Sequence, residues 1–196
     1  MQAIVDACAA GEIDGRVVLV VGNYGESPAL ERARMLHLET HVVSSPGKNA
    51  SAEDLKDYEN ALLALFACTQ PDLIVLAGYL LKLPDGVVRS YRGRIMNMHN
   101  ALLPAFGGRG MYGARVHEAV VAHGVKYSGC TVHFVDESYD TGPIILQSVV
   151  PVEDDDTPET LAARVLVAEH QTFPRAIALF AQGRLEVVGR KVITRE

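Results

Sequence analysis

The chain of 196 residues contains no tryptophan and only three cysteines, Cys8, Cys68 and Cys130. The cysteines lie far apart, form no C-x-x-C pair and are odd in number, which argues against a disulfide framework. Unpaired thiols fit a reducing compartment, so we expect a cytoplasmic protein. The cysteines and histidines also lack the spacing of metal ligands, and we predict no metal site.

Basic residues and long apolar runs are scarce as well. Lysine and arginine total 18 against 24 acidic residues, which gives a net charge of −6, whereas a nucleic-acid-binding surface normally needs a basic field. The longest apolar runs, such as residues 62–68, are much shorter than a membrane span. The first residues lack the basic and apolar regions of a signal peptide. We therefore predict neither a nucleic-acid partner nor a membrane location.

Apolar strands alternating with amphipathic helices make up most of the chain. This alternation predicts a doubly wound, mostly parallel α/β sheet with a mixed C-terminal extension. The length and the absence of a repeat or linker favour a single domain over residues 1–196. Pro174 is expected to kink or divide the last long helix, and residues 185–188 are expected to form an edge strand. The main strands are expected at residues 16–21, 41–43, 72–77, 127–135 and 144–150, and the main helices at 1–10, 52–69 and 114–123.

Asn97 and His99 end a further short apolar strand that starts near Arg94. Because they are two residues apart on an extended chain, both side chains point to the same face. The carboxyl ends of strands are where open α/β sheets bind their ligands. By itself the pair fits equally well with a buried histidine whose hydrogen bonds are satisfied by an asparagine.

Two carboxylates could join such a site. Asp140 lies in the loop Ser-Tyr-Asp-Thr-Gly-Pro, where turn chemistry alone would explain it; if it meets His99, its charge favours the imidazolium. Glu169 falls on the apolar face of the last helix, where a carboxylate needs a partner or a ligand. His133 shares a strand face with Thr131, which is more typical of a core histidine than of a ligand.

Four stretches resemble the folate-dependent phosphoribosylglycinamide formyltransferases, and the resemblance extends from residue 1 to about residue 190. An Asn-x-His pair with a distant Asp-x-Gly-Pro is typical of folate-dependent formyl transferases and hydrolases. The stretches are NMHNALLP (97–104), SGCTVHFV (128–135), DTGPIILQ (140–147) and EHQTFP (169–174). The resemblance implies a Rossmann-like formyltransferase fold. It also implies transfer of the formyl group of 10-formyltetrahydrofolate to the amine of 5′-phosphoribosylglycinamide in purine biosynthesis, without a metal.

The resemblance also implies roles for individual residues. His99 would be the general acid, Asn97 would polarise the formyl oxygen, and Asp140 would hold His99 charged. These roles agree with the need of an oxyanion for preorganised donors and of a leaving nitrogen for a proton. The folate would contact Leu80, Leu81, Lys82, Leu83, Asn97, Asp136, Glu137, Ser138, Tyr139 and Asp140. The ribonucleotide would contact Leu166, Val167, Ala168 and Glu169.

The chain departs from the family pattern in three places. Asn100 stands where relatives usually have proline, and the glycine-rich segment of residues 107–113 differs from that of some relatives. Relatives also begin with a strand and a phosphate-binding loop ahead of the helix that begins here at Met1. In a doubly wound sheet that strand would lie between residues 16–21 and 73–76, so its loss would expose two apolar strand edges. We expect Met1 to be an internal methionine of a protein that is about a dozen residues longer.

Two other functions remain open from the sequence. A formyltetrahydrofolate deformylase shares the three site residues, but it normally carries an N-terminal regulatory domain for which this chain has no room. A catalytically impaired folate-binding paralogue would fit the incomplete phosphate site. The predicted partners are small molecules, and the sequence leaves a homodimer open.

Overall fold

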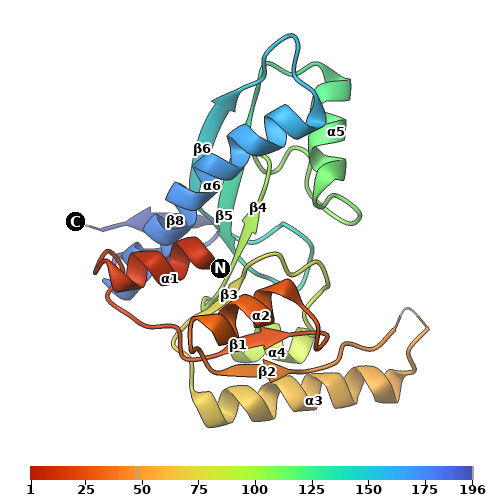
Figure 1. The fold of residues 1–196 in the computed structure, drawn as a ribbon, viewed down its shortest axis with the longest axis vertical. Coiled ribbons are helices and arrows are strands. Elements are labelled where there is room, and N and C mark those ends of the chain that lie inside the picture. Colours follow the sequence, from red (N-terminus) through yellow and green to blue (C-terminus); the bar gives the residue numbers. More distant parts are fainter. Residues whose placement is uncertain (48, 196) are drawn as a thin grey trace.

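The computed structural model describes residues 1–47 and 49–195 and has an α/β fold (Figure 1). Most of the elements fall close to where the sequence predicts them. The helices are α1 (Gln2–Ala9), α2 (Pro28–Met35), α3 (Ala52–Thr69), α4 (Asp85–Ser90), α5 (Ala114–His123) and α6 (Pro158–Ala181). The strands are β1 (Val20–Gly22), β2 (Thr40–Val42), β3 (Ile74–Leu76), β4 (Ile95–His99), β5 (Tyr127–Phe134), β6 (Ile144–Pro151), β7 (Leu185–Val188) and β8 (Lys191–Thr194).

The strands form two sheets, one of six strands in the order β3-β4-β5-β6-β8-β7 and one of the pair β1-β2. Pairing is parallel in β1-β2, β3-β4 and β6-β8 and antiparallel in β4-β5, β5-β6 and β7-β8. The predicted α/β class is confirmed, with parallel pairing in the first half of the chain and mixed pairing in the second. Strand β7 is the predicted edge strand, while β8 was not predicted.

The sheet is divided between β1 and β3. Each of these strands is paired along one edge only within the described residues. Val21 of β1 and Ile74 of β3 nevertheless pack in one apolar cluster, so the two strands border the same core. All of β3 is only half-buried, whereas Ile95 and Met96 of the neighbouring β4 are fully buried. The prediction of two apolar strand edges left unpaired at this place is confirmed.

Two long helices begin at the side-chain caps that their sequences favour. Ser51 accepts from the Asp54 N–H and Asp54 accepts from the Ser51 N–H, which closes a capping box at the start of α3. Thr157 caps α6 in the same way, with Pro158 in the first turn. The sequence predicts that Pro174 kinks or divides the last helix. Division is wrong, because α6 continues from Pro158 to Ala181 with Pro174 inside it, and a kink stays a prediction. Proline removes one helical N–H, and burial of the surrounding turn against the sheet compensates for that loss.

Helices cover both faces of the strands that carry the site. Helices α1 and α6 pack on one face of β4, β5 and β6, and α3 and α4 pack on the other side, against β3 and β4. Helix α5 packs with α6 near the far end of β5 and β6 (Figure 1). These layers bury β4 and β5 and leave the carboxyl end of β4 open to a cavity. None of the described helices combines the length and the apolarity that crossing a membrane requires.

Candidate active site

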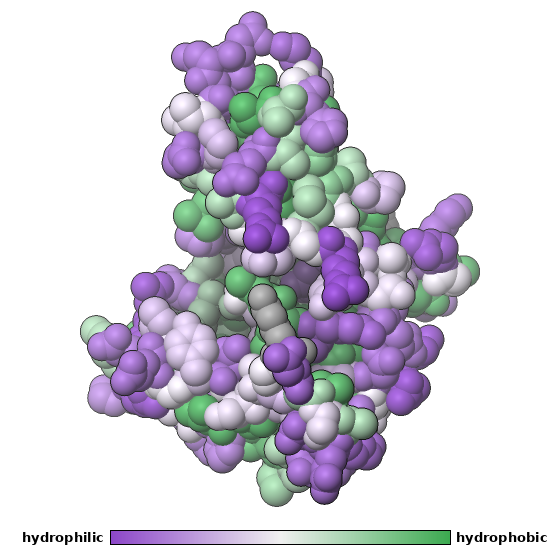
Figure 2. Space-filling model, turned by 90° about the vertical axis from the view of Figure 1, so that its right-hand side faces the viewer, coloured by the Kyte–Doolittle hydropathy of each residue, from purple (hydrophilic) through white to green (hydrophobic). Residues whose placement is uncertain are grey.

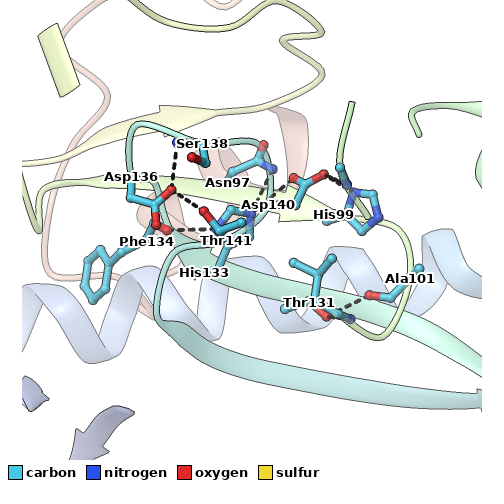
Figure 3. A network of polar contacts seen from close by, with 12 residues as sticks. Asn97, His99, Ala101, Thr131, His133, Phe134, Asp136, Ser138, Asp140 and Thr141 are labelled. Carbon is cyan, nitrogen blue, oxygen red and sulfur yellow. Dashed lines mark hydrogen bonds and ion pairs between the residues drawn. The ribbon is translucent and has the colours of Figure 1, made fainter. Parts of the chain in front are cut away.

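Asn97 and His99 occupy the carboxyl-terminal end of β4, and both line one cavity, as their spacing predicts. Strand β4 pairs antiparallel with β5, so that Asn97 lies opposite His133 and His99 opposite Thr131. His99 is only 5% exposed, although it borders the cavity. The strand pairing therefore brings an amide and two imidazoles together at one end of the cavity (Figure 3).

Asp140 lies between the two imidazoles (Figure 3). One carboxylate oxygen is 3.7 Å from His99 Nδ1 and the other is 3.6 Å from His133 Nε2. The Gly108 N–H donates to Asp140 Oδ2 at 2.9 Å. Burial alone would raise the pKa of Asp140, but the contact with His133, the Gly108 N–H and the charge of His99 together lower it below its usual value. Asp140 is therefore a carboxylate throughout the neutral range.

His99 is held by a backbone carbonyl on its other side. Its Nε2–H donates to the Phe106 carbonyl oxygen at 2.8 Å, because a carbonyl can only accept. In the neutral ring, Nδ1 is therefore the unprotonated nitrogen, and it faces Asp140. Burial lowers the pKa of His99 by more than Asp140 and the Phe106 carbonyl raise it. A lowered pKa leaves the ring of the ligand-free chain neutral near pH 7, and the role of Asp140 in holding His99 charged during the reaction stays a prediction.

His133 is a site residue that the sequence reasoning assigned to the core. It is 2% exposed, and its Nδ1–H donates to the Phe134 carbonyl oxygen at 2.8 Å. In the neutral ring Nε2 is then free to accept from Asn97 Nδ2 at 3.2 Å. His133 thus orients the Asn97 amide and also faces Asp140. Strand alternation places it on the face of Thr131, but only the register of β4 and β5 shows that this face meets Asn97.

The cavity beside these residues has walls from three loops, and all of the predicted folate contacts except Glu137 line it. Glu137 instead pairs with Arg92 at 2.7 Å. The sequence reasoning missed the third wall, the glycine-rich segment of residues 107–113. Figure 2 shows the molecule hollowed across the middle of one face, with apolar and polar residues meeting at the hollow. The lining residues from the three loops and β4 are Gly78–Leu83, Asn97–Asn100, Gly108, Gly110–Gly113, Asp136 and Ser138–Asp140.

The predicted ribonucleotide contacts lie on α6 and do not border this cavity. Leu166 and Val167 are exposed, and Ala168 packs against the cluster between α5 and α6. Glu169 is half-buried, and its carboxyl group makes no hydrogen bond or ion pair with any other described residue. Burial raises the pKa of Glu169 to about 7. Burial, and to a lesser extent the nearby charge of Glu169, raise the pKa of the Cys130 thiol. Glu169 therefore lies close to Cys130 of β5, and its carboxyl group has no partner in the described residues.

The formyl transferase family model matches residues 1–177. The chain belongs to the formyl transferase family. The chain is 40% identical over 185 residues to the chloroplastic phosphoribosylglycinamide formyltransferase of Arabidopsis thaliana, covering 94% of this chain and 62% of that protein, so it spans less than two thirds of that relative's length. It is 37% identical to the phosphoribosylglycinamide formyltransferase of Escherichia coli, covering 95% of this chain and 84% of that protein.

The chain is also similar to solved structures, among them a transformylase and a deformylase. The glycinamide ribonucleotide transformylase 1 of Symbiobacterium toebii superposes with a TM-score of 0.89 at 39% identity, over 100% of this chain and 88% of that one. A formyltetrahydrofolate deformylase of Pseudomonas syringae superposes with a TM-score of 0.86 at 25% identity, over 100% of this chain and 61% of that one. Within the described residues, no cluster of three or more His, Cys, Asp or Glu side chains could hold a metal ion.

Proposed function

We propose that the chain transfers the formyl group of 10-formyltetrahydrofolate to the amine of 5′-phosphoribosylglycinamide, a step of purine biosynthesis. The observation that carries the proposal is the Asp140 carboxylate between His99 and His133, with the Asn97 amide beside them at the end of the cavity. The names of the relatives support the substrate pair. The loop at residues 78–83 lines the cavity with mostly apolar side chains, and Asp136 and Ser138–Asp140 line it with mostly polar ones, a mixture that suits a flat ring with polar edges.

The reaction begins when the amine nitrogen attacks the formyl carbon. The π electrons of the formyl group move to its oxygen, and the resulting oxyanion needs donors already in place. Asn97 supplies an N–H, and its amide is oriented by the hydrogen bond to His133 at 3.2 Å. One preorganised donor of this kind typically contributes about 3–4 kcal/mol to the transition state.

His99 moves the proton that the amine must lose. Because the ring is neutral before reaction, its Nδ1 accepts this proton, and the imidazolium that forms lies beside Asp140. His99 then returns the proton to the folate nitrogen as the bond between that nitrogen and the formyl carbon breaks. Asp140 stabilises the imidazolium in between, and so the general acid role of His99 belongs to the second half of the reaction.

Glu169 is the proposed contact for the ribonucleotide. An unpaired, half-buried carboxyl group is unfavourable in the free chain. Sugar hydroxyls would donate to it and remove this cost. The exposed Leu166 and Val167 would border the same ligand, on the α6 side of β5.

An assay with the purified chain, both substrates and chromatographic detection of formylated product tests the proposal. We expect formyl transfer, and a loss of at least about 100-fold in kcat in His99→Ala, since a proton-transfer group typically contributes 10²–10⁴-fold. The formyltetrahydrofolate deformylase structure has the same fold, so release of formate without formylated product would instead assign a hydrolase. Folate binding with neither reaction would assign the impaired paralogue. A His99→Ala variant with full activity would falsify the mechanism.

Cytoplasmic location and a homodimer are further parts of the proposal. The three cysteines are free, and one is buried, which suits a reducing compartment. Cell fractionation tests the location. Light scattering across a range of protein concentrations tests the dimer.

A further inference from the structure

Asn100 lies one residue beyond His99 and lines the cavity. Its amide Nδ2 donates to His117 Nε2 at 2.9 Å and to the Gly113 carbonyl oxygen at 3.3 Å. Gly113 is the last residue of the glycine-rich segment, and His117 lies near the start of α5, which follows it. A proline at position 100 has no side-chain donor and could make neither bond.

The other end of this segment is held by the residues assigned to catalysis. The Phe106 carbonyl accepts from His99 Nε2, and the Gly108 N–H donates to Asp140. Between the two ends, Gly108 and Gly110 have positive φ angles of 95° and 91° and no atom within 4 Å of an added Cβ. These two glycines contribute no packing, so the position of the segment as a cavity wall depends on its two attachments and on Met111, which packs against the cluster between α5 and α6.

His117 has a buried ring nitrogen without a hydrogen-bond partner, which lowers the stability of the fold. Its Nε2 accepts from Asn100, so in the neutral ring the proton resides on Nδ1. That Nδ1 is buried without a hydrogen-bond partner in the described chain, and the residue is 4% exposed. An apolar side chain at this position would avoid the unpaired donor. Stability alone does not account for a histidine here, whereas an acceptor for Asn100 does.

We propose that Asn100 and His117 are a positioning pair, which fixes the glycine-rich segment as a wall of the folate cavity. The pair acts on folate binding through Gly113 and does not touch the reacting atoms. This inference rests on the proposed function for the identity of the ligand. The attachment of the segment by Asn100 and His117 exists in the ligand-free chain as well, so it can be tested without the ligand.

The test compares Asn100→Ala, His117→Leu, the double variant and His117→Gln, which keeps an acceptor. The probe is 5-formyltetrahydrofolate, titrated by calorimetry. We expect the Kd to rise about fivefold in each of the first two variants, the ratio that one typical hydrogen bond gives. The double variant is expected to add little to either single change, because the two residues share one interaction. His117→Gln should recover most of the affinity.

A second readout separates positioning from a general loss of stability. His117→Leu removes the unpaired donor, so its midpoint of thermal unfolding is expected to equal or exceed that of the parent. Amide hydrogen exchange in residues 107–113 should nevertheless become faster. Glu118→Ala, a change at an exposed neighbour on α5, is the matched control and should alter neither quantity.

The outcomes distinguish this proposal from the proposed function. Unchanged folate affinity and unchanged exchange in Asn100→Ala and His117→Leu would overturn the positioning pair. If the parent chain does not bind the probe, the proposed function fails, and hydrogen exchange alone decides whether the pair holds the segment. KM for the amine substrate is expected to stay constant in these variants; a rise equal to that of the folate KM would also contradict the proposal.

Discussion

At the scale of single residues, the site depends on where burial and charge oppose each other. His99 has a carboxylate as its neighbour and yet a lowered pKa, because the free energy lost on burying its charge is the larger effect. Asp140 has a lowered pKa despite burial, because the contact with His133, the Gly108 N–H and, when the ring is protonated, the charge of His99 favour its ionised form. The neutral imidazole and the ionised carboxylate are the forms that proton acceptance followed by proton donation requires.

Asp140→Asn tests this balance. Activity in kcat/KM is expected to rise with pH through the pKa of His99, since the neutral ring must accept a proton. The Asp140 charge raises that pKa, so its removal should move the acid limb to lower pH. The kcat should fall about 100-fold across the whole range, because the imidazolium loses its counter-charge. Rate profiles between pH 4.5 and 9 measure both effects, and an acid limb that stays in place would contradict the assignment.

Glu169→Gln tests the unpartnered carboxyl group. The folded-state pKa of Glu169 is raised to about 7, so the folded chain retains a proton that the unfolded chain releases near its ordinary pKa. Stability from this group is therefore present at low pH and is lost as the pH rises to about 7. The variant should be more stable than the parent above pH 7, by at most roughly 3 kcal/mol, and equally stable near pH 4.

Urea unfolding at pH 4.5 and pH 8.5 measures that difference. Glu118→Gln on the exposed face of α5 is the control, and its unfolding free energy should equal that of the parent at both pH values. The Glu169→Gln variant should also have a raised KM for the ribonucleotide if the carboxylate binds its hydroxyls. Equal stability of parent and variant at both pH values would mean that the carboxyl group has a partner.

At the scale of elements, the antiparallel pairing of β4, β5 and β6 assembles the site. The turn before β6 carries Asp140, and the Phe134 N–H donates to the Pro143 carbonyl at 2.9 Å, which closes the loop against the end of β5. This close approach explains the glycine of the Asp-x-Gly-Pro motif. A Cβ on Gly142 would lie 1.7 Å from the Phe134 carbonyl oxygen.

Gly142→Ala is therefore expected to force the loop away from β5. Because the obstacle is backbone rather than a flexible side chain, we expect a loss of at least about 2 kcal/mol in unfolding free energy. The loop also carries Asp140, so kcat should fall as well. Gly25→Ala is the matched control, since an added Cβ there meets no atom within 4 Å, and it should change stability by less than about 0.5 kcal/mol. Denaturant unfolding of both variants measures the two changes in unfolding free energy, and equal changes would contradict the prediction.

At the scale of the whole molecule, the strands of the described residues form two sheets that are divided between β1 and β3. The outward edges of β1 and β3 present backbone groups without partners in the described part of the chain, although one apolar cluster includes side chains of both strands. Unpaired strand edges reduce stability and invite pairing with another strand. The apolar core is thus continuous here, although the sheet beside it is divided.

A strand supplied at this place should join the two sheets. We predict that an apolar segment of about six residues, followed by a short loop and fused ahead of Met1, raises the midpoint of thermal unfolding by at least about 5 °C. A fusion of the same length with proline at alternate positions cannot pair and should leave the midpoint unchanged. Equal midpoints for both fusions would show that the edges do not accept a strand.

The sequence by itself determined the α/β class, most of the elements, and the placing of Asn97 and His99 on one strand face, because local periodicity and turn residues carry that information. The family motifs added Asp140. Only the tertiary structure decided that His133 meets Asn97, since strand register depends on how whole layers pack. It also decided that Phe106 and Gly108 hold the catalytic groups through backbone atoms, which no side-chain pattern encodes. The lowered pKa of His99 follows from burial. Burial depends on all of the surrounding contacts, and no short stretch of sequence determines it.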